Sequence, residues 1–152
     1  MKICDCLSDE CIICGVKAKD KWSFFKEISK PLSKVLGLPP EEIEKVLEER
    51  ERLGTTAIGH EIALPHSRLP GLDRIVLAVA LNKEGIDFEA LDRKPVKVVF
   101  VVLAPENESQ RYLKILAQLA RLLKNENFRQ RLLSCQSPEE IKKVLSEVDY
   151  EF

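Results

Sequence analysis

Both histidines of the chain lie in one short stretch, and one of them directly follows a proline. The stretch runs from Arg50 to Arg68, is punctuated by two glycines and contains His60 and the pair Pro65-His66. Glycine and proline interrupt regular structure, and such places often present a functional side chain on a loop. A neutral imidazole keeps a nitrogen lone pair at physiological pH, so His66 can attack phosphorus and later release the phosphoryl group.

Phosphoryl chemistry at His66 needs two kinds of support. An acceptor on one ring nitrogen fixes the tautomer, and a cation or a set of donors meets the charge on the phosphoryl oxygens. Arg50 is the candidate cation, because its planar fork matches two phosphate oxygens at once. Thr55 and Thr56 could add hydroxyl donors, and Ser67 a backbone N–H. From the residues alone, a solvated surface histidine with arginines nearby is the alternative.

Five cysteines allow a metal site to be considered, and four of them lie near the start: Cys4, Cys6, Cys11 and Cys14. If residues 11 to 16 form a strand, Cys11 and Cys14 project to opposite faces and cannot both ligate one ion without a bend. We therefore interpret these four cysteines as structural, with metal binding as the alternative. Cys135 is remote from them, and we expect it to be a half-buried packing residue. No glycine-rich phosphate loop, nucleophile elbow or zinc helix occurs, and we predict no metal and no cofactor.

The bulk composition is that of a single globular domain, which we expect to span residues 1–152. The chain is 45% hydrophobic and 32% charged, and its 24 basic and 25 acidic residues create no net field for nucleic acid or membranes. No apolar run approaches the ~18 residues of a membrane span, and the start has no signal-peptide pattern. An odd number of cysteines does not fit a secreted disulfide framework. We therefore expect a cytoplasmic protein without membrane insertion or a nucleic-acid partner.

Helices and strands alternate along the chain. Residues 11 to 16 indicate a strand, and a helix follows from an N-cap at Asp20 to a C-cap at Gly37, with Pro31 expected to kink or split it. The prolines at 39 and 40 start a second helix, which ends at Gly54. The apolar runs at residues 75–81 and 96–104 are typical of strands covered on both faces, so both should be central.

The C-terminal third is predicted to be helical. One helix follows Ser109, a second spans residues 125–133, and a capping box at residues 137–140 opens the last, which should bury Ile141, Val144, Leu145 and Val148. The first of these presents one apolar face, made of Tyr112, Leu113, Leu116, Leu119, Ala120 and Leu123. Strands interleaved with helices predict an α/β fold with helices on both faces of a sheet.

Around the two histidines the sequence resembles a known family. It is similar to the enzyme IIA component, mannitol/fructose type, of the bacterial phosphoenolpyruvate-dependent phosphotransferase system, and most of all to its free-standing nitrogen-regulatory branch. The matching residues are Arg50-Glu51-Arg52-Leu53-Gly54-Thr55-Thr56, then Ile58-Gly59, then Ile62-Ala63-Leu64-Pro65-His66. Weaker likeness covers nearly the whole chain.

This resemblance implies a mixed β-sheet flanked by helices and a phosphotransferase component that forms a stoichiometric phosphohistidine. The acceptor would be His66, phosphorylated by a histidine phosphocarrier protein, and the family's active-site arginine maps to Arg50. The phosphoryl group would pass to a separate enzyme IIB or act as a regulatory switch. The alternative is a purely regulatory protein-binding module of the nitrogen-regulatory type, with no role in sugar transport.

The chain departs from the family pattern at three places. Family members commonly carry a second histidine in the leucine-rich helix, where this chain has Tyr112, which either donates a hydrogen bond to the imidazole or phosphate or packs in the core. Ser67 stands where glycine, alanine or cysteine is commoner. His60-Glu61 replaces an Asn-Gly-like pair, and we expect His60 to be a solvated turn residue. Four nearby apolar residues are expected to form a collar for a partner or part of the core: Leu53, Ile58, Leu64 and Leu69.

Overall fold

A mixed sheet organises the chain, of which the computed structural model describes residues 1–149; the last three residues of the expected domain lie outside that range. The strands are β1 (Leu7–Cys14), β2 (Ala57–Gly59), β3 (Ile62–Ala63), β4 (His66–Arg68), β5 (Val76–Ile86) and β6 (Val96–Ala104). Their order is β1-β5-β6-β3-β2, and β4 continues beside β6. The pairs β1–β5, β3–β6 and β4–β6 are parallel, whereas β5–β6 and β2–β3 are antiparallel.

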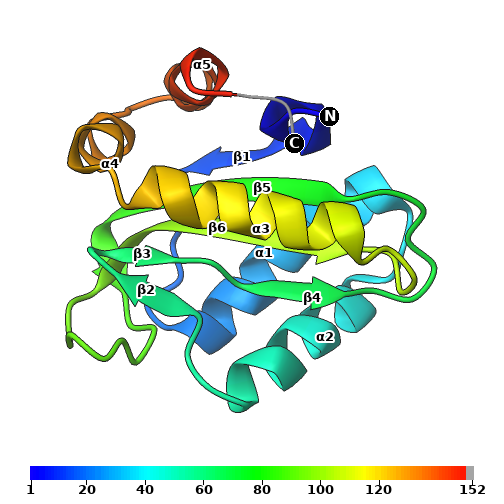
Figure 1. The fold of residues 1–152 in the computed structure, drawn as a ribbon. Helices are drawn as coiled ribbons and strands as arrows, with labels where there is room; N and C mark the ends of the chain where they lie inside the picture. Colours follow the sequence, from blue (N-terminus) through cyan, green and yellow to red (C-terminus); the bar gives the residue numbers. More distant parts are fainter. Residues whose placement is uncertain (150–152) are drawn as a thin grey trace.

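Helices cover both faces of this sheet (Figure 1). They are the short 3-10 helix η1 (Ile3–Cys6), α1 (Lys21–Leu36), α2 (Pro40–Arg52), α3 (Gln110–Leu123), α4 (Glu126–Leu133) and α5 (Pro138–Glu147). Helices α1 and α2 lie on one face, and α3, α4 and α5 on the other. The predicted fold, with a mixed sheet between helices, is confirmed.

The two central strands separate two apolar cores. On β6, Val98, Phe100 and Val102 pack with α3, α4 and α5, while Val99 and Val101 pack with α1 and α2. Because alternate side chains of a strand point to opposite faces, a continuous apolar run is what a strand covered on both faces requires. The predicted central strands are confirmed, with β6 at the predicted bounds and β5 extending past residue 81 to Ile86.

Strand β1 begins earlier than the sequence indicated. We predicted it from residue 11, but it starts at Leu7 and includes exposed Asp9 and Glu10, with an irregularity in its pairing between Leu7 and Ile12. An edge strand pairs on one side only and can carry exposed polar residues. The polar residues in the first half of β1 therefore interrupt the apolar pattern by which a strand is predicted.

Helix α1 confirms both predicted caps but not the predicted split. The Asp20 side chain accepts a hydrogen bond from the Ser23 N–H at 2.8 Å, and Gly37 ends the helix with a left-handed φ of 69°. The helix continues through Pro31. Buried Phe25, Ile28 and Leu32 hold it to the sheet on both sides of the proline, and burying three such side chains outweighs the ~3 kcal/mol cost of an interior proline.

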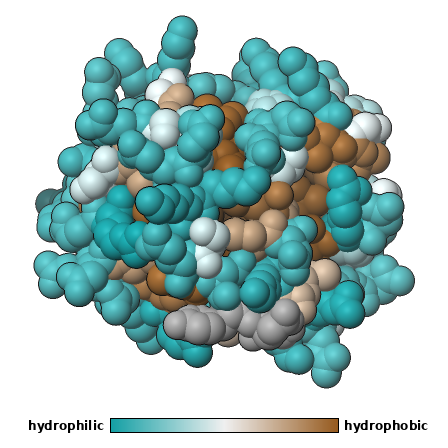
Figure 2. Space-filling model, turned by 90° about the horizontal axis from the view of Figure 1, so that it is seen from above, coloured by the Kyte–Doolittle hydropathy of each residue, from teal (hydrophilic) through white to brown (hydrophobic). Residues whose placement is uncertain are grey.

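The apolar face of α3 is rotated relative to the prediction. Leu113 is 63% exposed, so placing it on the buried face was wrong, and Ile115 and Gln118 are buried instead. Residues 112, 115, 119 and 123 recur at the helical spacing of three and four, whereas residue 113 points away. Ser137 caps α5 as predicted, accepting from the Glu140 N–H at 3.2 Å, although Val148 is only half-buried. Seen from the side of α4 and α5, hydrophilic side chains cover most of the surface, with hydrophobic ones between them (Figure 2).

The cysteines are dispersed over the two cores. Cys11 packs under α1, whereas Cys14 packs against the core on the other face, as the spacing predicted. Cys135 is fully rather than half buried, because it follows the last turn of α4 into the core beside α5. Burial, and for Cys4 also the Asp149 carboxylate, raises the pKa of the Cys4 thiol to about 12, and burial raises that of Cys6 and of Cys11 to about 11, so these thiols stay protonated at neutral pH.

Candidate functional site

The stretch from Arg50 to Arg68 folds as the end of α2, a hairpin and a strand. In the hairpin, His60 and Glu61 join β2 to β3 with left-handed φ angles of 56° and 67°. Two positive φ values are what a type I′ turn requires to match the twist of its strands. The Glu61 carboxylate also pairs with the Lys97 Nζ at 3.0 Å. His60 is exposed, as predicted for a turn residue, and belongs to the scaffold that leads to His66.

Strand β4 gives His66 a fixed direction. Its residues pair in register with β6, His66 with Val102 and Arg68 with Ala104, and the Val102 N–H donates to the Pro65 carbonyl at 3.0 Å. Val102 and Ala104 belong to the core beneath α3, so the side chains of His66 and Arg68 emerge on that face.

The His66 ring is oriented by the backbone just before it. Its Nδ1 lies 2.8 Å from the Leu64 carbonyl oxygen. A carbonyl oxygen can only accept, so Nδ1 donates in this contact, and in the neutral ring Nε2 then keeps its lone pair. The half-buried ring also meets Tyr112 of α3 edge to face, with the ring centroids 6.2 Å apart. His66 therefore has one nitrogen held and the other available for chemistry.

Two arginines approach this ring pair from different elements. The Arg50 Nη1 donates to the Gly54 carbonyl at 3.1 Å, at the end of α2. The Arg68 guanidinium lies over the Tyr112 ring, 5.2 Å from its centroid. Burial raises the pKa of the Tyr112 phenol, and the positive charges of Arg68 and Arg50 oppose that rise, so both cations act on the same place. Neither arginine forms an ion pair with a carboxylate within residues 1–149.

The hydroxyls of the two threonines predicted as donors are engaged elsewhere. The Thr55 hydroxyl donates to the Phe88 carbonyl and the Thr56 hydroxyl to the Glu51 carboxylate, both at 2.6 Å. Ser67 pairs with Leu103, so its side chain emerges on the opposite face of β4 from His66, and its hydroxyl donates to the Arg68 carbonyl. The predicted donor at Ser67 is its backbone N–H, and that role stays a prediction. The structure therefore brings His66 and Tyr112 into contact and places Arg50 where its charge acts on Tyr112, whereas the two threonine hydroxyls are engaged away from the imidazole.

The two threonines instead belong to a buried network that fixes the end of α2. The Glu51 carboxylate, in a residue 2% exposed, also accepts from the Thr56 N–H at 2.9 Å. It pairs with the Lys21 Nζ at 3.3 Å, and that nitrogen contacts the Glu89 carboxylate at 2.6 Å. Lys21 is only 3% exposed. Because Glu51 neighbours Arg50, the network positions the helix end that carries the arginine.

Sequence reasoning missed Lys21 and Arg68. Nothing near Lys21 in the sequence indicates that it meets a carboxylate from another helix. Arg68 had a usable signal, because it stands two residues after His66 in a stretch that forms a strand, and side chains two apart share a face.

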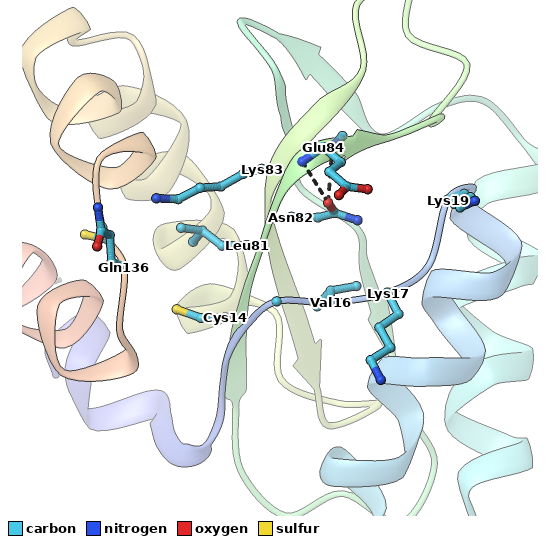
Figure 3. A pocket seen from close by; sticks show the side chains of 12 residues that line it. Cys14, Val16, Lys17, Lys19, Leu81, Asn82, Lys83, Glu84 and Gln136 are labelled. Atoms are coloured by element: carbon cyan, nitrogen blue, oxygen red, sulfur yellow. Dashed lines mark hydrogen bonds between the residues drawn. The ribbon is translucent and has the colours of Figure 1, made fainter.

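The molecule also has a hollow away from the histidine, shown in Figure 3. Its volume is about 560 Å³, and it lies between the end of β1, the middle of β5 and the turn before α5. Its lining includes Cys14, Leu81, Lys83 and Gln136 and none of the predicted site residues. On β6, Val102 pairs with His66 on one side and with Leu77 on the other. Leu77 lies four residues along β5 from Leu81, which lines the hollow. The hollow and the imidazole therefore lie at different ends of the sheet.

The fold and the His66 site define a class: an α/β protein with an imidazole held at Nδ1 by a backbone carbonyl, beside a tyrosine on which two arginines act. The chain belongs to the family described as phosphoenolpyruvate-dependent sugar phosphotransferase system, EIIA 2, which matches residues 5–148.

Individual relatives agree with this membership. The chain is 36% identical to a nitrogen regulatory protein of Bradyrhizobium diazoefficiens, over 96% of this chain and 95% of the relative. The crystal structure of the nitrogen regulatory protein IIA-Ntr from Neisseria meningitidis superposes with a TM-score of 0.87 at 30% identity, covering 93% of this chain and 97% of that one. The enzyme IIA for mannitol from Escherichia coli, in its complex with phosphorylated enzyme IIB, has a TM-score of 0.75 at 23% identity, covering 92% and 96%, which is a likeness of fold.

Proposed function

We propose that His66 is the phosphoryl acceptor of this phosphotransferase component, and that the Nε2 atom forms the bond to phosphorus. The observation that carries this assignment is the 2.8 Å contact between Nδ1 and the Leu64 carbonyl, which leaves only Nε2 free. Arg50 stands close enough to act electrostatically on Tyr112, the neighbour of the imidazole, and is free of carboxylates within the described residues. It supplies the cation that the transferring group needs.

The transfer conserves protons. The Nε2 lone pair of His66 attacks the phosphorus of a phosphohistidine on the donor, and the donor's phosphorus–nitrogen bond breaks. The donor ring, protonated on its other nitrogen, leaves as neutral imidazole. His66 becomes a phosphoimidazolium that keeps its own proton on Nδ1, where the Leu64 carbonyl holds it. No metal or cofactor takes part in these steps.

The partners are a histidine phosphocarrier protein as donor and an enzyme IIB or a regulatory target as receiver. Large exposed apolar side chains in the stretch from Arg50 to Arg68 and on α3 support a protein partner. Leu53, next to the Arg50 loop, is 85% exposed, Ile58 is 45% exposed, and Leu113 neighbours Tyr112, whereas Leu64 and Leu69 are core residues. The mannitol enzyme IIA that shares this fold forms a complex with phosphorylated enzyme IIB. Exposed apolar groups next to a reactive centre suit such transient docking.

A regulatory output is the second candidate. The relative that matches 96% of the chain at 36% identity is named a nitrogen regulatory protein. Tyr112 stands in the leucine-rich helix, where the resemblance to the family leads us to expect a second histidine. Phosphorylation would add about two negative charges beside the exposed Leu53 and Leu113 and change what binds there.

Two experiments test these assignments. Labelling from phosphoenolpyruvate with purified enzyme I and carrier protein tests acceptance of the phosphoryl group at His66. Co-purification with the unphosphorylated and phosphorylated forms of the chain separates the two outputs. Phosphate-dependent binding of a protein other than an enzyme IIB favours the switch, whereas discharge of the label onto an enzyme IIB favours the carrier.

We also propose that the chain functions as one enzyme IIA-like domain. Every described strand belongs to one sheet, and both cores share β5 and β6. Within the described residues, none of the helices has the length and apolar character needed to cross a membrane.

A further inference from the structure

We propose that Arg68 is a second catalytic arginine, which binds the phosphoryl group while it is carried on His66. This assignment rests on the proposed function of His66 and extends it. Arg68 would then bind phosphate on the side of the site where family members commonly carry a second histidine.

Strand geometry sets the first condition. His66 and Arg68 are two residues apart on β4, and their pairing with Val102 and Ala104 keeps both on the face beneath α3. Residues two apart on a strand have Cα atoms about 6.5 to 7 Å from each other. An extended arginine side chain spans that distance, so its guanidinium can meet a phosphoryl group attached to the neighbouring imidazole.

The contacts of Arg68 hold its guanidinium in place without consuming its charge. The planar group lies over the Tyr112 ring, and its Nη2 donates to the Ser109 hydroxyl at 3.3 Å. Both partners are neutral and both belong to α3 or its first turn. None of the carboxylates in residues 1–149 pairs with Arg68. An exposed arginine kept in place by neutral groups is ready for an anion.

Electrostatics supplies the second, independent observation. The charges of Arg68 and Arg50 both lower the pKa of Tyr112 against the effect of its burial, and Tyr112 is the residue whose ring meets His66. Arg50 comes from the end of α2 and Arg68 from β4, so the two cations that act on Tyr112 come from different elements. A phosphoryl group on Nε2 carries about two negative charges, which one guanidinium neutralises only in part.

During transfer the two arginines have complementary tasks. As the donor's phosphorus–nitrogen bond breaks and the bond to Nε2 forms, the charge on the three phosphoryl oxygens has to be met throughout. Arg50 and Arg68 each present a fork of N–H donors to these oxygens. The simpler alternative is that Arg68 only covers Tyr112 and secures the start of α3, and the choice of variants separates the two roles.

The test compares Arg68→Met, Arg68→Ala and Arg68→Lys with Arg121→Ala as the matched control, in full-length protein labelled from phosphoenolpyruvate through enzyme I and the carrier. Methionine keeps an apolar stem over Tyr112 but has no charge. Arg121 is an exposed arginine on the same helix α3, nine residues and therefore about 13 Å along the helix from Tyr112. Thermal unfolding of each variant reports whether α3 stays docked.

We expect Arg68→Met and Arg68→Ala to slow transfer to His66 about tenfold or more, because each removes charge-assisted hydrogen bonds to the phosphoryl oxygens. Arg68→Lys should transfer faster than Arg68→Ala, because lysine restores the positive charge without the planar fork. Arg121→Ala should transfer at the wild-type rate. If Arg68→Met transfers at the wild-type rate, the arginine only packs and the inference is overturned while the function of His66 stands. If the wild type takes up no label, the proposed function fails and this role for Arg68 fails with it.

Discussion

The Nδ1 atom of His66 and the carbonyl oxygen of Leu64, two residues earlier, lie 2.8 Å apart. This contact selects one tautomer, because the carbonyl can only accept and the ring nitrogen must donate. Pro65 lies between the two residues, and its fixed φ stiffens the link from the Leu64 carbonyl to the ring. The ring meets Tyr112 edge to face, and the Arg68 guanidinium lies over the same tyrosine.

The position of the phosphoryl group on the ring follows from this contact. We expect phosphorylated protein to carry the group on Nε2 and not on Nδ1. Two-dimensional proton–nitrogen NMR of the imidazole distinguishes the two isomers by their nitrogen shifts. Phosphorus on Nδ1 would mean that the contact with Leu64 breaks before transfer, and it would contradict the mechanism.

Arg50 is expected to contribute to the rate of transfer and not to the fold. Its side chain makes one hydrogen bond, to the Gly54 carbonyl, and no ion pair within the described residues. We expect Arg50→Ala to slow labelling of His66 roughly tenfold or more, as loss of one charged donor to a transition state does, with thermal unfolding almost unchanged. Arg52→Ala, two residues further along α2 and exposed, is the control. An Arg50→Ala protein that labels as fast as this control would reduce Arg50 to a surface charge.

The Glu51 carboxylate is expected to be a main determinant of stability. It accepts from the Thr56 hydroxyl and N–H and pairs with a buried lysine, Lys21. Removing one partner of a buried pair costs about 3 to 5 kcal/mol, and the lower end applies here because Lys21 retains Glu89. Urea unfolding of Glu51→Ala, with the exposed Glu49→Ala as control, measures this loss. Equal stability of the two variants would show that the network contributes nothing.

Much of the fold was readable from the sequence because its signals are local. The caps at Asp20, Gly37 and Ser137 and the apolar run of β6 depend on neighbouring residues and match the structure. Pro31 was misleading, since the packing of residues on either side of it outweighs its local cost.

The site was readable only in part. His66 and Arg50 stand out through residue type and resemblance, and the structure places them with Tyr112. The partners of Thr55 and Glu51 could not be predicted, because the Phe88 carbonyl lies 33 residues from Thr55 and Lys21 lies 30 residues from Glu51. Such contacts exist only once the sheet and helices have assembled.

The buried thiols should make the protein less stable in alkaline solution. Burial raises the pKa of Cys6 and Cys11 to about 11 from an ordinary 9.0, so above pH 9 the unfolded chain loses protons that the folded chain keeps. Their contribution to stability is complete below pH 9 and is lost as the pH rises toward 11. Urea unfolding at pH 8 and pH 10 should show the decrease, and Cys11→Ala should show a smaller one. An equal decrease in both proteins would assign the effect to other groups.

Transfer of phosphate from phosphoenolpyruvate to His66 is the most direct measurement of the central claim. Purified enzyme I, carrier protein and radiolabelled phosphoenolpyruvate are combined with the wild type, His60→Ala and His66→Ala. The acid-labile label on each chain is then counted. We expect equal label on the wild type and on His60→Ala, because His60 is an exposed turn residue, and none on His66→Ala. Label that persists on folded His66→Ala would contradict the assignment of His66 as the phosphoryl acceptor.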